Sequence, residues 1–203
     1  MSTTRLLLLG AVRIFQPVHG YLLRRELLSW QVEDWANVNP GSIYTGLRTL
    51  ARHGLLREEG GDPVAYRLTP DGETEFQRLL STALRDPEPG DSSRLLAGLC
   101  FMTFLPRTEV REALRARGLV LEAMISRQEA AARSIEQQRL APATTVELSR
   151  VVLHWLGGEL RWVGEFCERL DAGHYRFADD PAGPDRPVDG VWLPAVLDAP
   201  EQA

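Results

Sequence analysis

The sequence GSIYTGLRTLARHG, residues 41–54, has the spacing of one amphipathic helix. Because successive residues of an α-helix advance by about 100°, Ile43, Leu47 and Leu50 fall within about 60° of one another. Gly54 follows at the position where helices often end with a residue of positive φ. We therefore predict a helix over residues 41–53 with one buried apolar ridge.

The opposite side of this predicted helix is polar and holds no acidic residue. It carries Tyr44, Thr45, Arg48, Thr49 and Arg52. Arginine can reach the O6 and N7 atoms of guanine, whereas threonine and tyrosine can contact a phosphate or the thymine methyl group. Such a face suits the major groove of DNA. A merely solvated helix face explains the same pattern equally well on spacing alone.

The elements predicted around this helix are short. Two amphipathic helices precede it, over residues 4–15 and 20–29. Two strands that flank a Gly-Gly-Asp-Pro turn follow it, over residues 55–59 and 64–69, and a connecting helix spans 71–84. Three helices followed by a β-hairpin is the order of a winged helix-turn-helix domain.

Several motifs of this region share their order and spacing with one bacterial family. They are HGYLL at residues 19–23, PGSIY at 40–44, GLL at 54–56 and YRLT at 66–69, followed by Gly72. The region resembles the N-terminal domain of PadR transcriptional regulators, and a looser resemblance to the larger PadR subgroup extends into the second domain. This resemblance implies a homodimer that binds double-stranded operator DNA, usually as a repressor, and in many members responds to a small aromatic or drug-like effector.

The candidate DNA-binding residues lie on the recognition helix and on the elements beside it. They are Ser42, Tyr44, Thr45, Arg48, Thr49 and Arg52, with Arg67, Arg24 and Arg25 as phosphate contacts. PadR proteins commonly have proline after the tyrosine of this helix, whereas this chain has Thr45 and then Gly46, which predicts a looser helix start because glycine costs about 1 kcal/mol relative to alanine. The acidic wing residues Glu58, Glu59 and Asp62 would oppose close phosphate contact by the wing tip, so we expect phosphate to be bound by Arg67, Arg24 or Arg25 and by helix ends.

A second domain begins after the segment DPEPGD, residues 86–91, which interrupts helical spacing. Helices are predicted over residues 94–105, 106–140 and 145–170. The longest has a heptad-like seam of residues at alternating steps of four and three: Val110, Leu114, Arg117, Leu121, Met124, Gln128, Ala131 and Ile135. We expect a partner chain to bury Leu114, Leu121, Met124 and Val163. The predicted fold is mainly α: a winged helix-turn-helix domain with a small β-hairpin wing (residues 1–85), an all-helical dimerisation domain (92–171) and a Pro-rich acidic tail (172–203).

Four tryptophans are candidate effector contacts. Trp30 and Trp35 bracket a polar stretch after the second helix, and Trp155 and Trp162 lie seven residues apart on one face of the last helix. Flat aromatic surfaces stack well against planar ligands. Packing between domains, for the first pair, and a dimer core, for the second, explain these residues at least as well.

Composition limits the remaining possibilities. The 203-residue chain has 28 acidic and 23 basic residues, all of the latter arginine, for a net charge of -5. Cys100 and Cys167 are too far apart for a cysteine-based disulfide framework or zinc module, and a metal shared by His154, Cys167 and His174 would be a chance arrangement. We find no catalytic or phosphate-binding motif and no membrane span, so we expect a cytoplasmic protein that is not an enzyme and needs no cofactor. The alternative to a DNA-binding regulator is a winged-helix adaptor that binds proteins.

The last 26 residues carry the excess negative charge. Residues 178–203 hold six acids against Arg186 alone, with Val191, Trp192 and Leu193 as one apolar group. This composition is typical of a mobile segment that docks at one point. The tail either attaches there to the C-terminal helices or competes with phosphates for the DNA-binding face.

Overall fold

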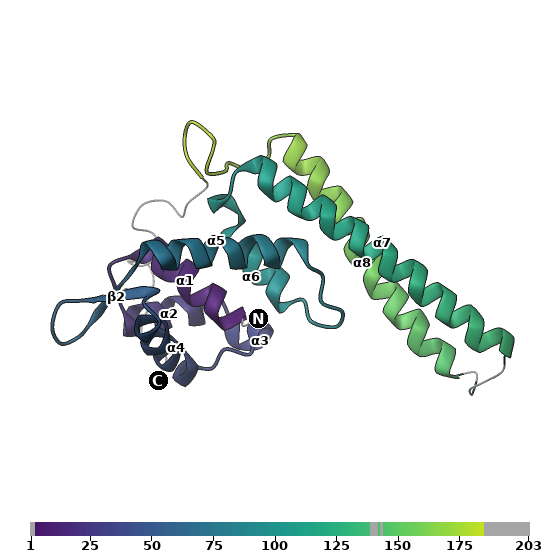
Figure 1. Ribbon diagram of the computed structural model, residues 1–203, viewed down its shortest axis with the longest axis horizontal. Helices are drawn as coiled ribbons and strands as arrows, with labels where there is room; N and C mark the ends of the chain where they lie inside the picture. Colours follow the sequence, from purple (N-terminus) through teal and green to yellow (C-terminus); the bar gives the residue numbers. More distant parts are fainter. Residues whose placement is uncertain (1–2, 139–141, 143, 185–203) are drawn as a thin grey trace. The chain divides into compact units, whose positions relative to one another are not determined.

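The computed structural model describes residues 3–138, 142 and 144–184 (Figure 1). The described residues form two compact units. One contains residues 3–80 and 96–101, and the other contains residues 81–95 and 102–184. This division differs from the expected ranges 1–85 and 92–171, because the end of the sixth helix groups with the N-terminal unit.

The N-terminal unit has the element order of a winged helix-turn-helix. Its elements are α1 (Thr3–Phe15), β1 (Val18–His19), α2 (Gly20–Ser29), α3 (Val32–Ala36), α4 (Pro40–Arg52), β2 (Leu56–Glu59), β3 (Ala65–Leu68) and the first part of α5 (Pro70–Arg85). The expected helices and the hairpin are confirmed. The short helix α3 and the strand β1 are additions to the predicted order.

The sheet has three antiparallel strands in the order β1-β3-β2. Strand β3 lies in the centre, so that Val18 of β1 pairs with Tyr66 and Leu56 of β2 pairs with Leu68. The wing is therefore attached to the segment just before α2. This attachment fixes the wing beside the helix-turn-helix formed by α2, α3 and α4.

The core of this unit forms around α1, of which every residue from Leu6 to Val12 is buried. The predicted ridge of α4 is confirmed, since Ile43, Leu47 and Leu50 are buried. Phe101, at the end of α6 (Ser93–Phe101), is also buried. A Cβ atom on Gly10 would lie only 2.5 Å from the Phe101 ring, so glycine is required there for α1 and this ring to meet.

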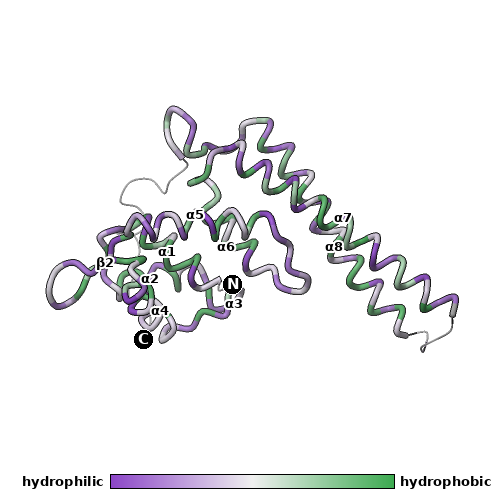
Figure 2. Tube along the Cα trace, in the orientation of Figure 1, coloured by the Kyte–Doolittle hydropathy of each residue, from purple (hydrophilic) through white to green (hydrophobic). Residues whose placement is uncertain are grey.

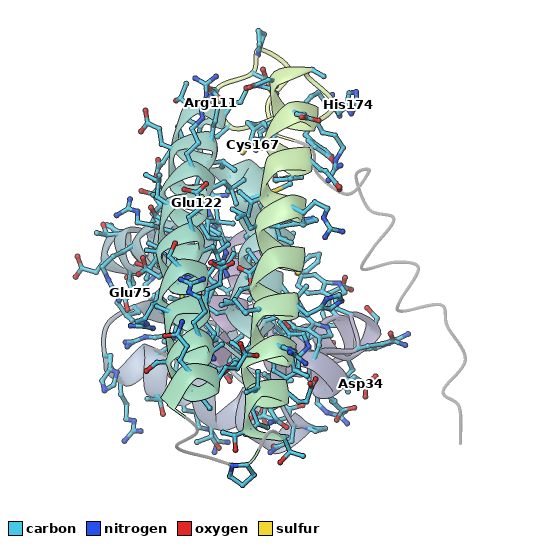
Figure 3. The ribbon with its side chains drawn as sticks, turned by 90° about the vertical axis from the view of Figure 1, so that its right-hand side faces the viewer. Asp34, Glu75, Arg111, Glu122, Cys167 and His174 are labelled. Atoms are coloured by element: carbon cyan, nitrogen blue, oxygen red, sulfur yellow. The ribbon has the colours of Figure 1, made fainter. Side chains whose placement is uncertain are left out.

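The second unit is built on two long antiparallel helices, α7 (Arg107–Gln138) and α8 (Thr144–Asp171), which follow the short 3₁₀ helix η1 (Met102–Phe104). Figure 3 shows α7 and α8 side by side, with Arg111 and Cys167 near the same end. Hydrophobic and hydrophilic residues alternate along both helices in Figure 2, as expected for helices buried on one side. The seam residues Val110, Leu114 and Leu121 of α7 are buried.

The segment after α8 is held against the start of α7. The Arg107 guanidinium donates hydrogen bonds to the carbonyl oxygens of Leu170 (2.9 Å) and Tyr175 (2.7 Å) and to the Asp180 carboxylate (2.9 Å). It also lies 4.9 Å from the ring centre of Phe177, which is fully buried. The described tail residues 172–184 contain no helix or strand, and Arg107 attaches them to the start of α7. Residues 191–193 lie outside the described residues.

Candidate nucleic-acid interface

The first turn of α4 is capped by its own sequence. The side chain of Asn39 accepts a hydrogen bond from the Ser42 backbone N–H at 2.9 Å, and the Ser42 hydroxyl donates to the Asn39 carbonyl oxygen at 2.7 Å. Pro40 occupies the first helical position, where its missing N–H costs nothing. These features define the helix start despite the absence of the proline that PadR proteins commonly carry after the tyrosine.

Gly46 has a packing role that sequence reasoning missed. A Cβ atom at this position would lie 2.4 Å from Cδ1 of Leu8 on α1. Glycine therefore allows α1 and α4 to approach closely. The absence of a side chain at this position thus serves the packing of α4 on α1.

The polar face of α4 faces away from this core. Tyr44, Thr45, Arg48 and Arg52 are exposed, whereas Thr49 is half-buried. The Thr49 hydroxyl accepts a hydrogen bond from the Arg52 guanidinium at 3.1 Å. The face therefore offers two arginines, a phenol and hydroxyl groups, without an acidic residue on the helix.

A second aromatic residue lies near the start of α2. Tyr21 is 52% exposed, and its ring stacks on His19 with the centroids 5.8 Å apart. The ring of Tyr44 lies over Gly20, because a Cβ atom there would be 3.2 Å from Cε1 of Tyr44. Tyr21 is not among the candidate DNA-binding residues named from the sequence, although its exposed phenol is an additional hydrogen-bonding group.

The arginines expected to contact phosphate have different surroundings. Arg24 and Arg25 are half-buried on α2. On the wing, Arg67 donates to the Glu59 carboxylate at 2.9 Å, and Arg57 binds the same carboxylate. The hydrogen bonds from Arg57 and then Arg67 lower the pKa of Glu59. The carboxylate is thus charged at neutral pH and offsets part of the positive charge of the wing.

The four tryptophans lie in different environments. The Trp30 indole donates to the buried Glu26 carboxylate at 3.0 Å, and Trp35 donates to the Trp30 carbonyl oxygen at 3.0 Å. Trp162 stacks on Phe166 at 5.2 Å. Trp155, in contrast, is 62% exposed and lines a cavity of about 160 Å³ together with residues 89–90 and other residues of α8.

The residues expected at a dimer interface are mostly buried within one chain. Leu114, Leu121 and Val163 are buried, while Met124 is half-buried. The chain itself covers the first three side chains, so no partner chain is needed to bury them. The large apolar side chains that the second unit leaves exposed are Leu119, Val120, Leu148, Val151 and Trp155.

Among residues 3–138, 142 and 144–184, no group of three or more His, Cys, Asp and Glu side chains could hold a metal ion. None of the described helices combines the length and apolarity that crossing a bilayer requires.

Comparison with known proteins gives a family for the N-terminal unit. Residues 8–78 match the model of the transcriptional regulator PadR-like family. No curated protein matches the chain.

Solved structures give weaker similarities. The PadR-like regulator BC1756 of Bacillus cereus is 20% identical, with a TM-score of 0.35, over 84% of this chain and 99% of its own. Bacillus subtilis PadR in complex with p-coumaric acid is 17% identical, with a TM-score of 0.38, over 83% of this chain and 99% of its own. The same protein in complex with operator DNA is 17% identical, with a TM-score of 0.35, over 82% of this chain and 98% of its own.

The matched residues 8–78 include the capped helix α4, the hairpin β2-β3 and the first half of α5. Over these residues, which make up less than half of the chain, the chain is similar to the transcriptional regulator PadR-like family.

Proposed function

We propose that the protein is a cytoplasmic repressor that binds operator DNA through α4. The observation that carries this proposal is the exposed face of α4, which presents Tyr44, Arg48 and Arg52 without an acidic residue on the helix. Arg48 and Arg52 can read guanine or bind phosphate, and the Tyr44 and Tyr21 phenols can donate to phosphate oxygens. Arg24 and Arg25 of α2 and Arg67 of β3 add phosphate contacts.

We also propose that a second copy of the chain covers α8. Leu148, Val151 and Trp155 recur at steps of three and four, which places them on one stripe of this helix. Leu148 is 70% exposed, so this stripe is not covered by α7. Apolar residues at this spacing fit a second helix with the same pattern, as in a twofold homodimer. A twofold dimer would read a near-palindromic operator.

The effector is the third part of the proposal. Of the four tryptophans, Trp155 combines an exposed ring with a cavity. Because Trp155 also belongs to the proposed dimer stripe, a small aromatic molecule stacked on this ring would lie at the proposed dimer interface. Titration of planar aromatic compounds should then quench tryptophan fluorescence, and Trp155→Phe should remove most of this quenching.

Fluorescence anisotropy with a labelled DNA fragment from upstream of the protein's own gene tests the function. Specific binding should exceed binding to a scrambled fragment, and log Kd should rise linearly with log salt concentration because counterions are released. Arg48→Ala should weaken specific binding by about 1–3 kcal/mol. Arg127→Ala, at an exposed position on α7, is the matched control and should have no effect. Absence of salt-sensitive binding would favour a protein-binding adaptor.

A further inference from the structure

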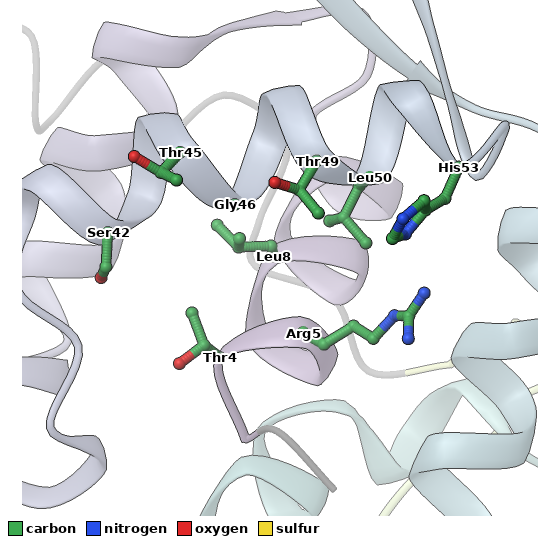
Figure 4. A pocket seen from close by; sticks show the side chains of 9 residues that line it. All are labelled: Thr4, Arg5, Leu8, Ser42, Thr45, Gly46, Thr49, Leu50 and His53. Carbon is green, nitrogen blue, oxygen red and sulfur yellow. The ribbon is translucent and has the colours of Figure 1, made fainter.

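A groove runs between α1 and α4 on the surface of the N-terminal unit (Figure 4). Its volume of about 360 Å³ falls within the range of pockets that bind small organic molecules. We propose that this groove binds a small monocarboxylate with an apolar body. We further propose that the bound molecule weakens DNA binding by α4, a part that rests on the proposed function.

One end of the groove is positively charged. Figure 4 shows the Arg5 guanidinium of α1 and the His53 imidazole, just after α4, at the same end. The carboxylate nearest to Arg5 is that of Glu75, at 3.6 Å, which is beyond hydrogen-bond distance. In the part of the chain that the structure describes, Nε of Arg5 has no hydrogen-bond partner.

The Glu75 carboxylate is hydrogen-bonded to a different arginine. Its two carboxylate oxygens accept hydrogen bonds of 2.7 and 3.0 Å from Arg78. This interaction is the main reason that the pKa of Glu75 is lowered. Arg5, Arg78 and Glu75 therefore sum to one positive charge, and this end of the groove favours an anion whose oxygens can accept from the Arg5 guanidinium.

The middle of the groove is apolar. Leu8 and Leu50 lie there in Figure 4, and Gly46 contributes no side chain between them. Thr4, Ser42 and Thr45 line the remainder. A molecule with a carboxylate at the Arg5 end and a hydrocarbon body over the two leucines matches this order. Inorganic phosphate or a DNA phosphate could use only the charged end.

The groove shares residues with the proposed DNA-binding face. Thr45 and Thr49 line it and also belong to the polar side of α4. A bound molecule would contact these side chains, and its carboxylate would add a negative charge beside the helix that carries Arg48 and Arg52. Both effects oppose the approach of DNA.

Sodium hexanoate is a suitable probe, titrated into the ¹⁵N-labelled full chain at constant ionic strength. We expect saturable binding with amide shifts concentrated at Gly46, Thr49 and His53. Hexan-1-ol and hexylammonium chloride lack the anionic head, so each should bind at least about tenfold more weakly. Equal binding of hexanol, or shifts concentrated elsewhere in the chain, would overturn the proposed site.

Two variants test the charge at the Arg5 end and the space within the groove. Arg5→Gln removes the charge and should weaken hexanoate binding at least about tenfold, whereas Arg127→Gln makes the same change at an exposed position of α7 and should not. Thr4→Phe fills the groove from α1 and should also abolish binding. Circular dichroism and thermal unfolding establish that each variant is folded. Hexanoate affinity that is unchanged in both Arg5→Gln and Thr4→Phe contradicts the proposal.

The effect on DNA is measured separately, by anisotropy with hexanoate and with an equal concentration of sodium chloride. DNA binding that is weaker in hexanoate than in sodium chloride supports control through the groove. Equal DNA binding in the two salts overturns the proposed effect on DNA. If the parent chain binds no hexanoate and Arg5→Gln nevertheless weakens DNA binding, Arg5 contacts a DNA phosphate and the proposal is overturned. If the chain binds no DNA at all, the proposed function fails, while the hexanoate titration still decides the site.

Discussion

Arg117 of α7 donates a 2.6 Å hydrogen bond from Nε to the carboxylate of Glu159 on α8, although the arginine side chain is only 2% exposed. The same guanidinium donates to the carbonyl oxygens of Ala83 (3.1 Å) and Leu84 (3.3 Å) in the last turn of α5. A buried arginine thus joins three helices of the second unit. Removing its acidic partner would leave a buried charge poorly compensated.

We therefore predict that Glu159→Gln lowers the free energy of unfolding by about 1–3 kcal/mol in urea denaturation. Glu165→Gln, at an exposed position of the same helix, is the control and should change it by less than about 0.5 kcal/mol. Equal effects of the two substitutions would show that the ion pair with Arg117 contributes nothing specific.

Gly72 is required by the backbone of the wing. A Cβ atom at this position would lie 2.0 Å from the carbonyl oxygen of Leu55, which also accepts a 3.1 Å hydrogen bond from the Thr69 N–H. Gly72→Ala should destabilise the protein by about 1–3 kcal/mol, because backbone must move. Gly61→Ala, where a Cβ meets open space, is the control. Thermal unfolding distinguishes them, and similar melting temperatures for both variants would contradict the prediction.

Glu26 predicts a pH dependence of stability. Its side chain is fully buried, and Oε2 has no hydrogen-bond partner among the described residues. Burial raises the pKa of this carboxyl above its usual value, although the hydrogen bond from Trp30 acts in the opposite direction. The Glu26 side chain therefore makes its full contribution to stability below the pKa that its carboxyl has in the unfolded chain. This contribution is lost as pH rises through the higher pKa that the carboxyl has in the folded protein.

Glu26→Gln should remove this dependence. The stability of the variant relative to the parent should increase as pH is raised from about 4 to 8, as measured by urea denaturation at several pH values. Glu33→Gln, at an exposed position, should show no such trend. A constant difference between Glu26→Gln and the parent at every pH would mean that the carboxyl does not titrate in this range.

The wing predicts an electrostatic effect on DNA binding. Glu59 binds both Arg57 and Arg67, so Glu59→Gln should release positive charge for phosphate contact. Operator binding should strengthen most at low salt, and the slope of log affinity against log salt should become steeper by up to about 1. Asp34→Asn, which lies on α3 outside the wing, is the control. Unchanged affinity and slope would show that the wing does not approach DNA.

The stripe on α8 predicts the oligomeric state. Replacing both Leu148 and Val151 by arginine should convert a dimer to a monomer in multi-angle light scattering, because two charges would face the partner helix. Glu168→Arg, at an exposed position on another side of the same helix, should leave the mass unchanged. A parent chain that is already monomeric at micromolar concentration would contradict the dimer itself.

The recognition helix could be predicted from its sequence because its signals are local. The ridge of Ile43, Leu47 and Leu50 repeats every three or four residues, and Gly54, at φ 73°, follows the helix end. Strand β1 has only two residues, too few for an alternating pattern, and α3 has only five. Such short elements depend on their partners, here Tyr66 for Val18, and not on their own sequence.

The contacts that shape the candidate sites were not predictable for a different reason. The fit of Leu8 against Gly46 joins residues far apart in the chain, and periodicity carries no information about such pairs. The seam residue Arg117 could be placed on the inner side of α7, but its acidic partner could not be identified. The groove near Arg5 likewise depends on how α1 crosses α4.

Phe101 completes the core of the N-terminal unit from beyond the linker that follows α5. Its ring lies 5.7 Å from that of Phe76 and 6.0 Å from that of Trp30, and it fills the space left by Gly10. On the ribosome, the residues that match the PadR-like family emerge well before this ring does. We therefore expect the nascent N-terminal unit to lack part of its core until α6 has left the exit tunnel.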